Sequence, residues 1–181
     1  MKQSVAGEVI YRKNYRAYPW SVKRLDLHFD IGAETTTVHA EMEFQLKGDD
    51  DDRQSIVLNG SNLQLVSLTI NDRALGADEY TVDGEKLTIP DAPAQCVLKT
   101  KVLIHPAANT ALEGLYLSGE FLLTQCEAQG FRKITWFPDR PDVMTTYRVT
   151  LEADKSDFPV LLSNGNEIDR GDLPDGRHWV C

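Results

Sequence analysis

Three neighbouring residues, Gln125, Cys126 and Glu127, carry side chains that could bind a ligand or take part in a reaction. The carboxylate of Glu127 can hold a ligand ammonium group through charge-assisted hydrogen bonds. Gln125 would share a face with Glu127 on an extended segment, and its amide offers both a donor and an acceptor. Spacing alone does not separate this pair from ordinary solvated side chains, because most Glu and Gln residues lie at the surface.

Other reactive or binding side chains have simpler interpretations. Cys126 could act as a nucleophile, but no histidine lies near it in the sequence, and a buried, inert thiol is the more ordinary role. Arg132 and Arg140 could clamp an anion or pair with the surrounding acidic residues. Three aromatic side chains could form a platform for sugar stacking or, as is usual beside β-branched residues, pack in the core: Trp136, Phe137 and Trp179.

The histidines do not form a metal-binding pattern, because no two of the four have a ligand spacing such as i, i+4. We expect His28 and His39 to be solvated, since both fall on the polar phase of alternating segments. The acidic run at residues 49–52 lacks the alternating ligands and the glycine of a calcium loop, and we expect a solvated loop tip. The sequence contains no GxSxG or GxGxxG motif and no phosphate-binding P-loop, which disfavours a self-contained enzyme of a common class.

The composition is that of an ordinary folded protein, with 181 residues of which 41% are apolar and 26% charged. This length suits one domain, or at most two small ones, with a sizeable core. The formal net charge of −9 repels phosphate groups, so we expect neither a nucleic acid nor an anionic membrane as a partner.

The cellular environment is indicated by the cysteines and by the hydropathy pattern. Cys96, Cys126 and Cys181 are odd in number and far apart, which suggests neither a disulfide framework nor a CxxC metal site. Residues 1–18 lack the apolar stretch of a secretory signal, and no window approaches the 18 apolar residues of a membrane-spanning helix. We therefore expect a reducing, cytoplasmic location.

Apolar and polar residues alternate along much of the chain, which is the period of a half-buried strand. Over residues 38–46 the apolar face includes Val38 and Phe44, and the polar face includes His39 and Glu41. The pattern predicts an all-β, antiparallel domain with one packed and one solvated sheet face. Further strands are expected at residues 25–30, 56–58, 63–70, 80–82, 86–89, 96–105, 147–153, 160–162 and 178–180.

Turn signals separate these strands. Residues 31–34 read as a hairpin connection, and Asp83 followed by Gly84 predicts a type I′ turn. Residues 139–142 could form at most one short helical turn. Residues 109–138 show only weak periodicity, and an irregular segment held by a rigid sheet often carries function.

Several strings of residues occur in the same order as in one known family. They are residues 11–16, 106–116, 124–128, 130–132, 134–135, 139–143, 161–166 and 176–180. On these strings, and over nearly its whole length, the chain resembles the N-terminal domain of the M1 zinc metallopeptidases of the bacterial aminopeptidase N type. The resemblance implies a saddle-shaped, mostly antiparallel multi-strand β domain that lies over a thermolysin-like catalytic domain.

The resemblance also implies roles for two residues. Glu127 would help to hold the free α-amino group of a peptide substrate, and Gln125 would line the pocket for the first side chain. The parent protein would release N-terminal amino acids from peptides by means of zinc-activated water. The expected partners are therefore the catalytic domain of the same parent chain and the N-terminus of a peptide.

The catalytic motifs of that family are missing from this sequence. There is no HExxH helix motif for zinc and no GxMEN loop to grip the substrate. We expect no catalytic residue, metal ligand or cofactor in this chain, with zinc belonging to the full-length parent. We interpret residues 1–181 as a single N-terminal β domain, either an expressed fragment or a truncated gene product, that is inactive by itself.

Two other functions stay open at this point. The chain could be a free-standing β-sandwich module that binds carbohydrate or protein, or a purely structural domain with an inert loop at Gln125 and Glu127. A domain without its catalytic partner would expose an apolar face, and we expect that such a fragment can self-associate. The residues expected on that face are Leu115, Tyr116, Phe121, Leu122 and Trp136.

Overall fold

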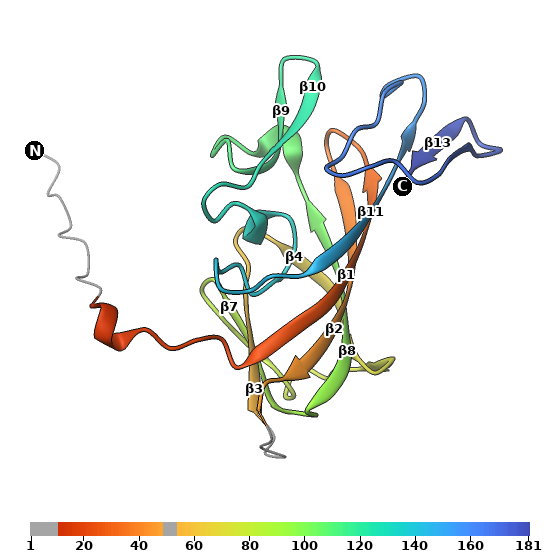
Figure 1. The fold of residues 1–181 in the computed structure, drawn as a ribbon. Helices are drawn as coiled ribbons and strands as arrows, with labels where there is room; N and C mark the ends of the chain where they lie inside the picture. Colours follow the sequence, from red (N-terminus) through yellow and green to blue (C-terminus); the bar gives the residue numbers. More distant parts are fainter. Residues whose placement is uncertain (1–10, 49–53) are drawn as a thin grey trace, which may run out of the picture.

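A computed structural model describes residues 11–48 and 54–181 (Figure 1). The acidic run at residues 49–52 lies outside the described residues. Within them the chain forms β-strands and short 3-10 turns and contains no α-helix, which confirms the prediction of an all-β fold. None of the described segments is a helix of the length and apolarity needed to cross a membrane.

The two longest strands, β1 (Trp20–Ile31) and β2 (Thr36–Leu46), form the centre of the fold. They pair in antiparallel fashion through the predicted hairpin connection, with His28 opposite His39. The burial of β2 alternates at every residue, as its sequence predicts. In β1 the register shifts by one residue between Val22 and Arg24, so the strand keeps its apolar face inward on both sides of the irregularity.

Six more strands extend this pair into one large sheet within the described residues. They are β4 (Gln64–Ile70), β5 (Arg73–Ala74), β8 (Gln95–Ile104), β11 (Thr146–Asp154), β12 (Arg170–Asp172) and β13 (Arg177–Val180). The order across the sheet is β12-β13-β11-β1-β2-β8-β4-β5. Strand β8 ends at Ile104, two residues before Pro106, because proline cannot donate a hydrogen bond to the ladder. Pro106 begins the 3-10 turn that follows.

The sheet is not wholly antiparallel, and here the prediction from sequence was wrong. Strand β11 pairs with β1 in parallel, from Arg24 opposite Thr146 to Ile31 opposite Ala153. A tight hairpin imposes antiparallel pairing on strands that follow each other directly, whereas β11 returns to β1 after a long crossing of the molecule. The alternation of residues 147–153 identifies a strand but contains no information about its direction.

A smaller sheet covers part of the inner face of the large one. Its strands are β3 (Gln54–Asn59), β6 (Thr81–Asp83) and β7 (Lys86–Ala92), in the order β3-β7-β6. The turn between β6 and β7 consists of Gly84 and Glu85, and of these two only Gly84 has a positive φ, of 55°. The predicted type I′ turn is therefore wrong, since that turn needs a positive φ at both central positions.

The hydrophobic core lies between the two sheets. It combines the inward residues of β1, β2 and β8 with those of β3 and β7. An irregular segment completes it, since Ile134, Trp136 and Phe137 are also buried. Backbone hydrogen bonds join Phe137 to Asn59 in both directions, at 2.8 and 3.1 Å, so this segment continues the small sheet.

One further expectation of local structure was wrong. Residues 160–162 do not form a strand, and Val160 and Leu162 are exposed. A short apolar string of this kind is compatible with more than one backbone path. Residues 139–142 contain one hydrogen-bonded turn, in which the Val143 amide donates to the Arg140 carbonyl oxygen at 3.2 Å. Within the described chain, 3-10 turns occur at Arg12–Asn14, Pro106–Ala108 and Phe131–Lys133.

Asp142 ties the start of the described chain to this fold. Its carboxylate accepts two hydrogen bonds of 2.8 Å from the Arg140 guanidinium, and one of 3.0 Å each from the Tyr18 amide and the Tyr15 hydroxyl. The hydrogen bonds from Arg140, followed by that from Tyr18, hold the pKa of Asp142 well below its usual range. The charged carboxylate is therefore the form that stabilises the native state.

We expect Asp142→Asn to lower the free energy of unfolding at pH 7 by about 1–2 kcal/mol, because the amide loses the charge-assisted bonds. A carboxylate whose pKa is depressed on folding contributes stability above its unfolded pKa and loses it as the pH falls. The difference between the variant and the wild type should therefore shrink below about pH 4. Urea titrations from pH 3 to 7 measure this difference in the free energy of unfolding.

Asp172→Asn, at an exposed pair with Lys155, serves as the control, and its free energy of unfolding should differ little from that of the wild type. An equal loss of stability in both variants would contradict the role of Asp142.

Candidate functional site

A hairpin that the sequence did not predict carries the first of the candidate residues. Strands β9 (Gly114–Ser118) and β10 (Phe121–Gln125) pair in antiparallel fashion and project from one end of the molecule (Figure 1). Gln125 is the last residue of β10 and lies opposite Gly114. The weak periodicity of this segment has a physical cause: the hairpin is short and both of its strands are largely exposed, so burial imposes little alternation on it.

The hairpin has one inward and one outward face. Leu115 is buried and Leu122 packs against the core, so their side of the hairpin is turned inward. The opposite side carries Phe121, Leu123 and Gln125 along β10. Phe121 is 70% exposed and Leu123 46% exposed, so this outward face places apolar surface directly beside Gln125.

The apolar face predicted from sequence is therefore only partly correct. Phe121 is exposed and Tyr116 is half-buried, as such a face requires. Leu115 and Trp136 belong to the core, with exposures of 7% and 3%, and cannot contribute to a surface. Strand alternation sends Leu115 and Tyr116 to opposite sides of the hairpin, which composition alone could not reveal.

A tight loop follows the hairpin and carries Glu127. The Gly130 amide donates a hydrogen bond of 2.8 Å to the carbonyl oxygen of Cys126, which closes the loop. The Glu127–Ala128 peptide bond is cis. A Cβ atom at Gly130 would lie 2.4 Å from the carbonyl oxygen of Gln125 and 2.9 Å from the Cα atom of Cys126. Glycine at position 130 is therefore what lets the loop fold back on the end of β10.

The downstream end of the loop is fixed to the core. Asp139 accepts hydrogen bonds of 3.1 Å from both the amide and the Nε of Arg132. The Arg132 carbonyl oxygen accepts a bond of 2.8 Å from the Ser61 amide. The Phe131 ring meets the Phe137 ring edge to face, with centroids 5.1 Å apart. These contacts confirm that Arg132 pairs with an acidic residue and that Phe137 packs in the core.

The segment that leads into β9 depends on Asn109, a residue that the sequence analysis did not single out. The side-chain amide of Asn109 donates to the carbonyl oxygens of Glu113 and Leu115, at 2.8 and 2.9 Å. Its oxygen accepts a bond of 3.1 Å from the Ala111 amide. Asn109 thereby shapes the approach to β9. The available signal in the sequence was a single asparagine, a residue type that favours turns, five positions before Gly114.

Gln125 and Glu127 are both exposed and lie together, but not as members of one strand. Strand β10 ends at Gln125 and Glu127 lies in the turn, so an extended segment does not bring them to a shared face. Instead the Gln125 side-chain nitrogen donates to the backbone oxygen of Glu127 at 3.4 Å. This contact involves the backbone of Glu127, whose side chain is exposed to solvent.

The nearest cations in the sequence are committed to other carboxylates. Arg132 binds Asp139 at 3.1 Å and lies 3.7 Å from Glu85. Lys133 lies 3.6 Å from Glu113. In the part of the chain that the structure describes, Glu127 takes part in no ion pair. An exposed carboxylate on a fixed loop, with its neighbouring cations engaged elsewhere, is suited to receive an external cation such as an ammonium group.

Cys126 does not have the character of a nucleophile. Its side chain is half-buried, and burial, followed by the charge of Asp139, raises the pKa of the thiol. A raised pKa keeps the sulfur protonated, whereas nucleophilic attack needs the thiolate. The interpretation of Cys126 as an inert thiol agrees with this.

The described residues do not fit a zinc site. Across residues 11–48 and 54–181, no three His, Cys, Asp or Glu side chains converge to hold a metal ion. A catalytic zinc needs three protein ligands and an open position.

Comparison with known proteins identifies similar sequences. The family model described as the Peptidase M1 N-terminal domain matches residues 13–181. Aminopeptidase N of Caulobacter vibrioides is 49% identical over 167 residues, which cover 92% of this chain and 19% of that protein. Aminopeptidase N of Escherichia coli is 46% identical over 170 residues, covering 94% and 19%. The chain thus spans about a fifth of the length of these relatives.

Solved structures show the same fold. Aminopeptidase A of Legionella pneumophila, in complex with aspartic acid, is 33% identical with a TM-score of 0.85, covering 93% of this chain and 20% of that one. An M1 zinc metallopeptidase variant from Deinococcus radiodurans, bound to a Tyr-Ser-Ala substrate, is 13% identical with a TM-score of 0.72, covering 90% and 38%. The second likeness concerns the fold alone.

Gly130→Ala should displace the loop that carries Glu127 and lower the free energy of unfolding by about 1–3 kcal/mol, because the added methyl group meets backbone atoms that cannot rotate away. Amide chemical shifts of residues 125–128 and a urea titration measure the two effects. Gly76→Ala is the matched control, since its methyl group would meet only the ends of two side chains, those of Asp78 and Glu79, and no backbone atom. Unchanged shifts in Gly130→Ala would show that the loop does not need glycine.

Proposed function

This chain belongs to the Peptidase M1 N-terminal domain family, and we propose that it is the substrate-anchoring and scaffolding domain of a zinc aminopeptidase. The parent enzyme would release N-terminal amino acids from peptides. The curated relatives carry the matching segment as a fifth of a longer chain, which favours this role over a free-standing module that binds carbohydrate or protein.

The observation that supports the proposal is that Glu127 is exposed on a closed loop and has no cation from the described part of the chain paired with it. It is exposed, the loop that bears it is closed by Gly130, and the following cations Arg132 and Lys133 are held by other carboxylates. The Gln125 and Glu127 positions match the Q-x-E element implied by the family resemblance. Glu127 would receive the α-ammonium group of the peptide, and Gln125 would line the pocket for its first side chain.

The proposed role of Glu127 is orientation and not bond cleavage. Holding the terminal ammonium fixes the distance to the first carbonyl carbon, so that this carbonyl reaches the reacting group in a productive position. An internal peptide nitrogen carries no positive charge and offers no such contact. The anchor would therefore restrict the parent enzyme to the ends of peptides.

The scaffolding role would use the outward face of the hairpin. Phe121 and Leu123 place exposed apolar surface beside Gln125, where the catalytic domain of the same parent chain would pack. Zinc and its ligands would come from that domain. Separated from it, the same surface would favour self-association of the fragment.

We also propose a cytoplasmic location for the parent and a single domain for residues 1–181. All three cysteines are free in the structure, as a reducing compartment favours. A core cluster that joins the large sheet, the small sheet and segment 134–137 supports one folding unit.

In the full-length parent, Glu127→Gln should lower kcat/KM roughly 10- to 100-fold, which corresponds to the 1.5–3 kcal/mol of a hydrogen bond to a charged group. Hydrolysis of an alanyl anilide substrate measures this. Glu120→Gln, an exposed carboxylate in the turn of the same hairpin, is the matched control and should leave kcat/KM unchanged. Equal activity of Glu127→Gln and wild type would refute the anchoring role.

The 181-residue chain alone should hydrolyse no aminoacyl substrate, with or without added zinc, because it contains no HExxH motif and its described residues form no metal-binding group. Aminoacyl anilides at high protein concentration provide the assay, with the full-length parent as the positive control. Zinc-dependent turnover by the pure fragment, inhibited by a chelator, would contradict this prediction.

A further inference from the structure

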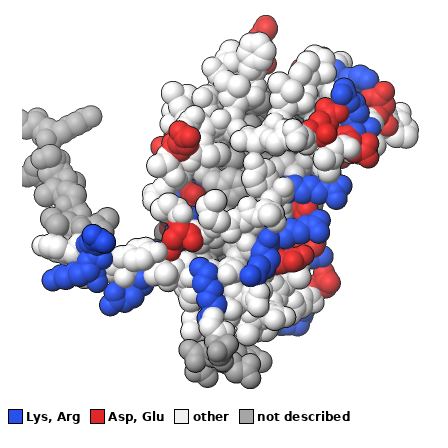
Figure 2. Space-filling model, viewed as in Figure 1, with Lys and Arg blue, Asp and Glu red and all other residues white. Residues whose placement is uncertain are grey.

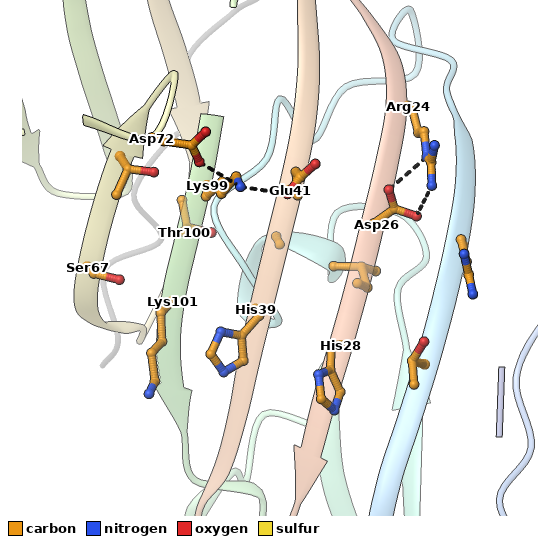
Figure 3. A pocket seen from close by; sticks show the side chains of 15 residues that line it. Arg24, Asp26, His28, His39, Glu41, Ser67, Asp72, Lys99, Thr100 and Lys101 are labelled. Carbon is orange, nitrogen blue, oxygen red and sulfur yellow. Dashed lines mark hydrogen bonds and ion pairs between the residues drawn. The ribbon is translucent and has the colours of Figure 1, made fainter. Parts of the chain in front are cut away.

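The outer face of the large sheet contains a hollow of about 660 Å³ (Figure 3). None of the residues that line it belongs to the loop that bears Glu127. Its floor consists of the solvated faces of five neighbouring strands, β4, β8, β2, β1 and β11. Figure 2 shows Lys and Arg side chains in a band below the C-terminal strands, with acidic side chains beside them. The lining of the hollow itself includes the cations Arg24, Lys99, Lys101 and Arg148. The net charge of the chain is −9, so cationic surface here is unexpected.

One row of residues crosses these five strands in register. Ser67 of β4 pairs with Lys101 of β8, Lys101 with His39 of β2, His39 with His28 of β1, and His28 with Thr150 of β11. Residues paired on neighbouring strands point to the same face of the sheet. Each of these five side chains can donate a hydrogen bond, and none is a carboxylate. From Lys101 to Thr150 the row spans about 14 Å, at the usual spacing of strands.

The two imidazole rings lie at the centre of the row. Their centroids are 5.9 Å apart and their planes differ by 30°, so the rings are stacked (Figure 3). His28 meets Glu152 at 3.1 Å, and that carboxylate is shared with Arg177 at 2.8 Å. His39 has a cation, Lys101, on its other side.

The adjacent row, in contrast, is electrically balanced. Lys99 binds Glu41 at 3.0 Å and Asp72 at 2.8 Å, and Asp26 binds Arg24 at 2.7 Å. Arg148, opposite Asp26 in the register, supplies the third cation against these three carboxylates. Among the ion pairs of the described residues, Lys101 takes part in none. The hollow therefore joins a neutralised row to a row that is rich in donors and holds an uncompensated ammonium group.

We propose that this donor row is a binding site for a small oxyanion, a carboxylate or a phosphate-like group, held between Lys101 and the pair of His28 and His39. The ammonium group supplies the charge, and the imidazole N–H groups supply directed hydrogen bonds. Ser67 and Thr150 extend the donor set at the two ends, so that a ligand with two anionic groups could occupy the row.

Binding should be coupled to protonation of His39. Burial, then the charges of Lys101 and His28, lower the pKa of His39, while Asp30 opposes this. A bound anion favours the charged imidazole, so binding takes up a proton and tightens as the pH falls. The charged and titratable groups around the imidazole pair are Lys99 and Lys101 of β8, Glu41 of β2, Arg24, Asp26 and Asp30 of β1, Asp72 between β4 and β5, Arg148 and Glu152 of β11, and Arg177 of β13.

Sulfate and acetate are suitable probes, because their charges do not change between pH 6 and pH 8. Each is titrated into the 181-residue chain at constant ionic strength with chloride as the balancing salt, and the imidazole signals are followed by NMR. We expect saturable shifts of His28 and His39, an apparent affinity at least about fivefold higher at pH 6 than at pH 8, and a rise in the midpoint of the His39 titration. A response to sulfate over acetate indicates a phosphate-like ligand, and the reverse indicates a carboxylate.

Lys101→Ala should weaken the binding about tenfold, as expected for a lost charge-assisted contact. Lys86→Ala, an exposed lysine of the small sheet, is the matched control and should bind like the wild type. Shifts that are linear in anion concentration, or that are equal in the Lys101→Ala and Lys86→Ala variants, would overturn the proposal. So would a response of the imidazoles to divalent cations alone, because the row would then be a metal-binding pair.

Discussion

The whole structure depends on covering the inner face of the large sheet. The small sheet covers part of this apolar surface, and the irregular segment 134–137 covers the rest. Segment 134–137 can pack there because the Trp136 ring lies against Gly60, where a Cβ atom would be 2.3 Å from the ring. Because Trp136 is fixed there, the residues just before it are fixed as well, and these include the 3-10 turn and the loop that bears Glu127. The position of the candidate site thus follows from the packing of a tryptophan in the core.

The strands that were predicted from sequence are those on which burial imposes a period. Residues 38–46 alternate because one face of β2 is buried along its whole length. The β9–β10 hairpin lacks this constraint, and its alternation was correspondingly weak. Strand direction was not predictable either, since Tyr147 and Val149 alternate in the same way whether β11 runs parallel or antiparallel to β1. The alternation of apolar and polar residues along a segment indicates which side chains are buried. It does not indicate which strand the segment pairs with or in which direction, because this depends on the path of the chain between the two strands.

The candidate site was predictable by resemblance and not by spacing. Gln125 and Glu127 look like ordinary surface residues in the sequence, and in the structure they are indeed exposed. What distinguishes them is their surroundings: Gly130 closes the loop, Asp139 holds Arg132, and Asn109 shapes the approach to the hairpin. These supporting residues lie up to 30 positions apart (Asn109 to Asp139), so no local spacing rule could connect them. Even so, Gly130 and Asn109 are of residue types that are common in turns.

The parallel pairing of β1 with β11 has a consequence for how the chain acquires its structure. Arg24 lies opposite Thr146 in the register, so one edge of β1 has its partner 122 positions later in the sequence (146 minus 24). The other edge is satisfied by β2, which begins only a few residues after β1 ends. During synthesis, the hairpin of β1 and β2 can therefore form early, while the opposite edge of β1 presents unpaired amide and carbonyl groups until most of the chain has emerged. Contacts of such long sequence separation form slowly, and for that interval β1 is the strand most open to pairing with another molecule.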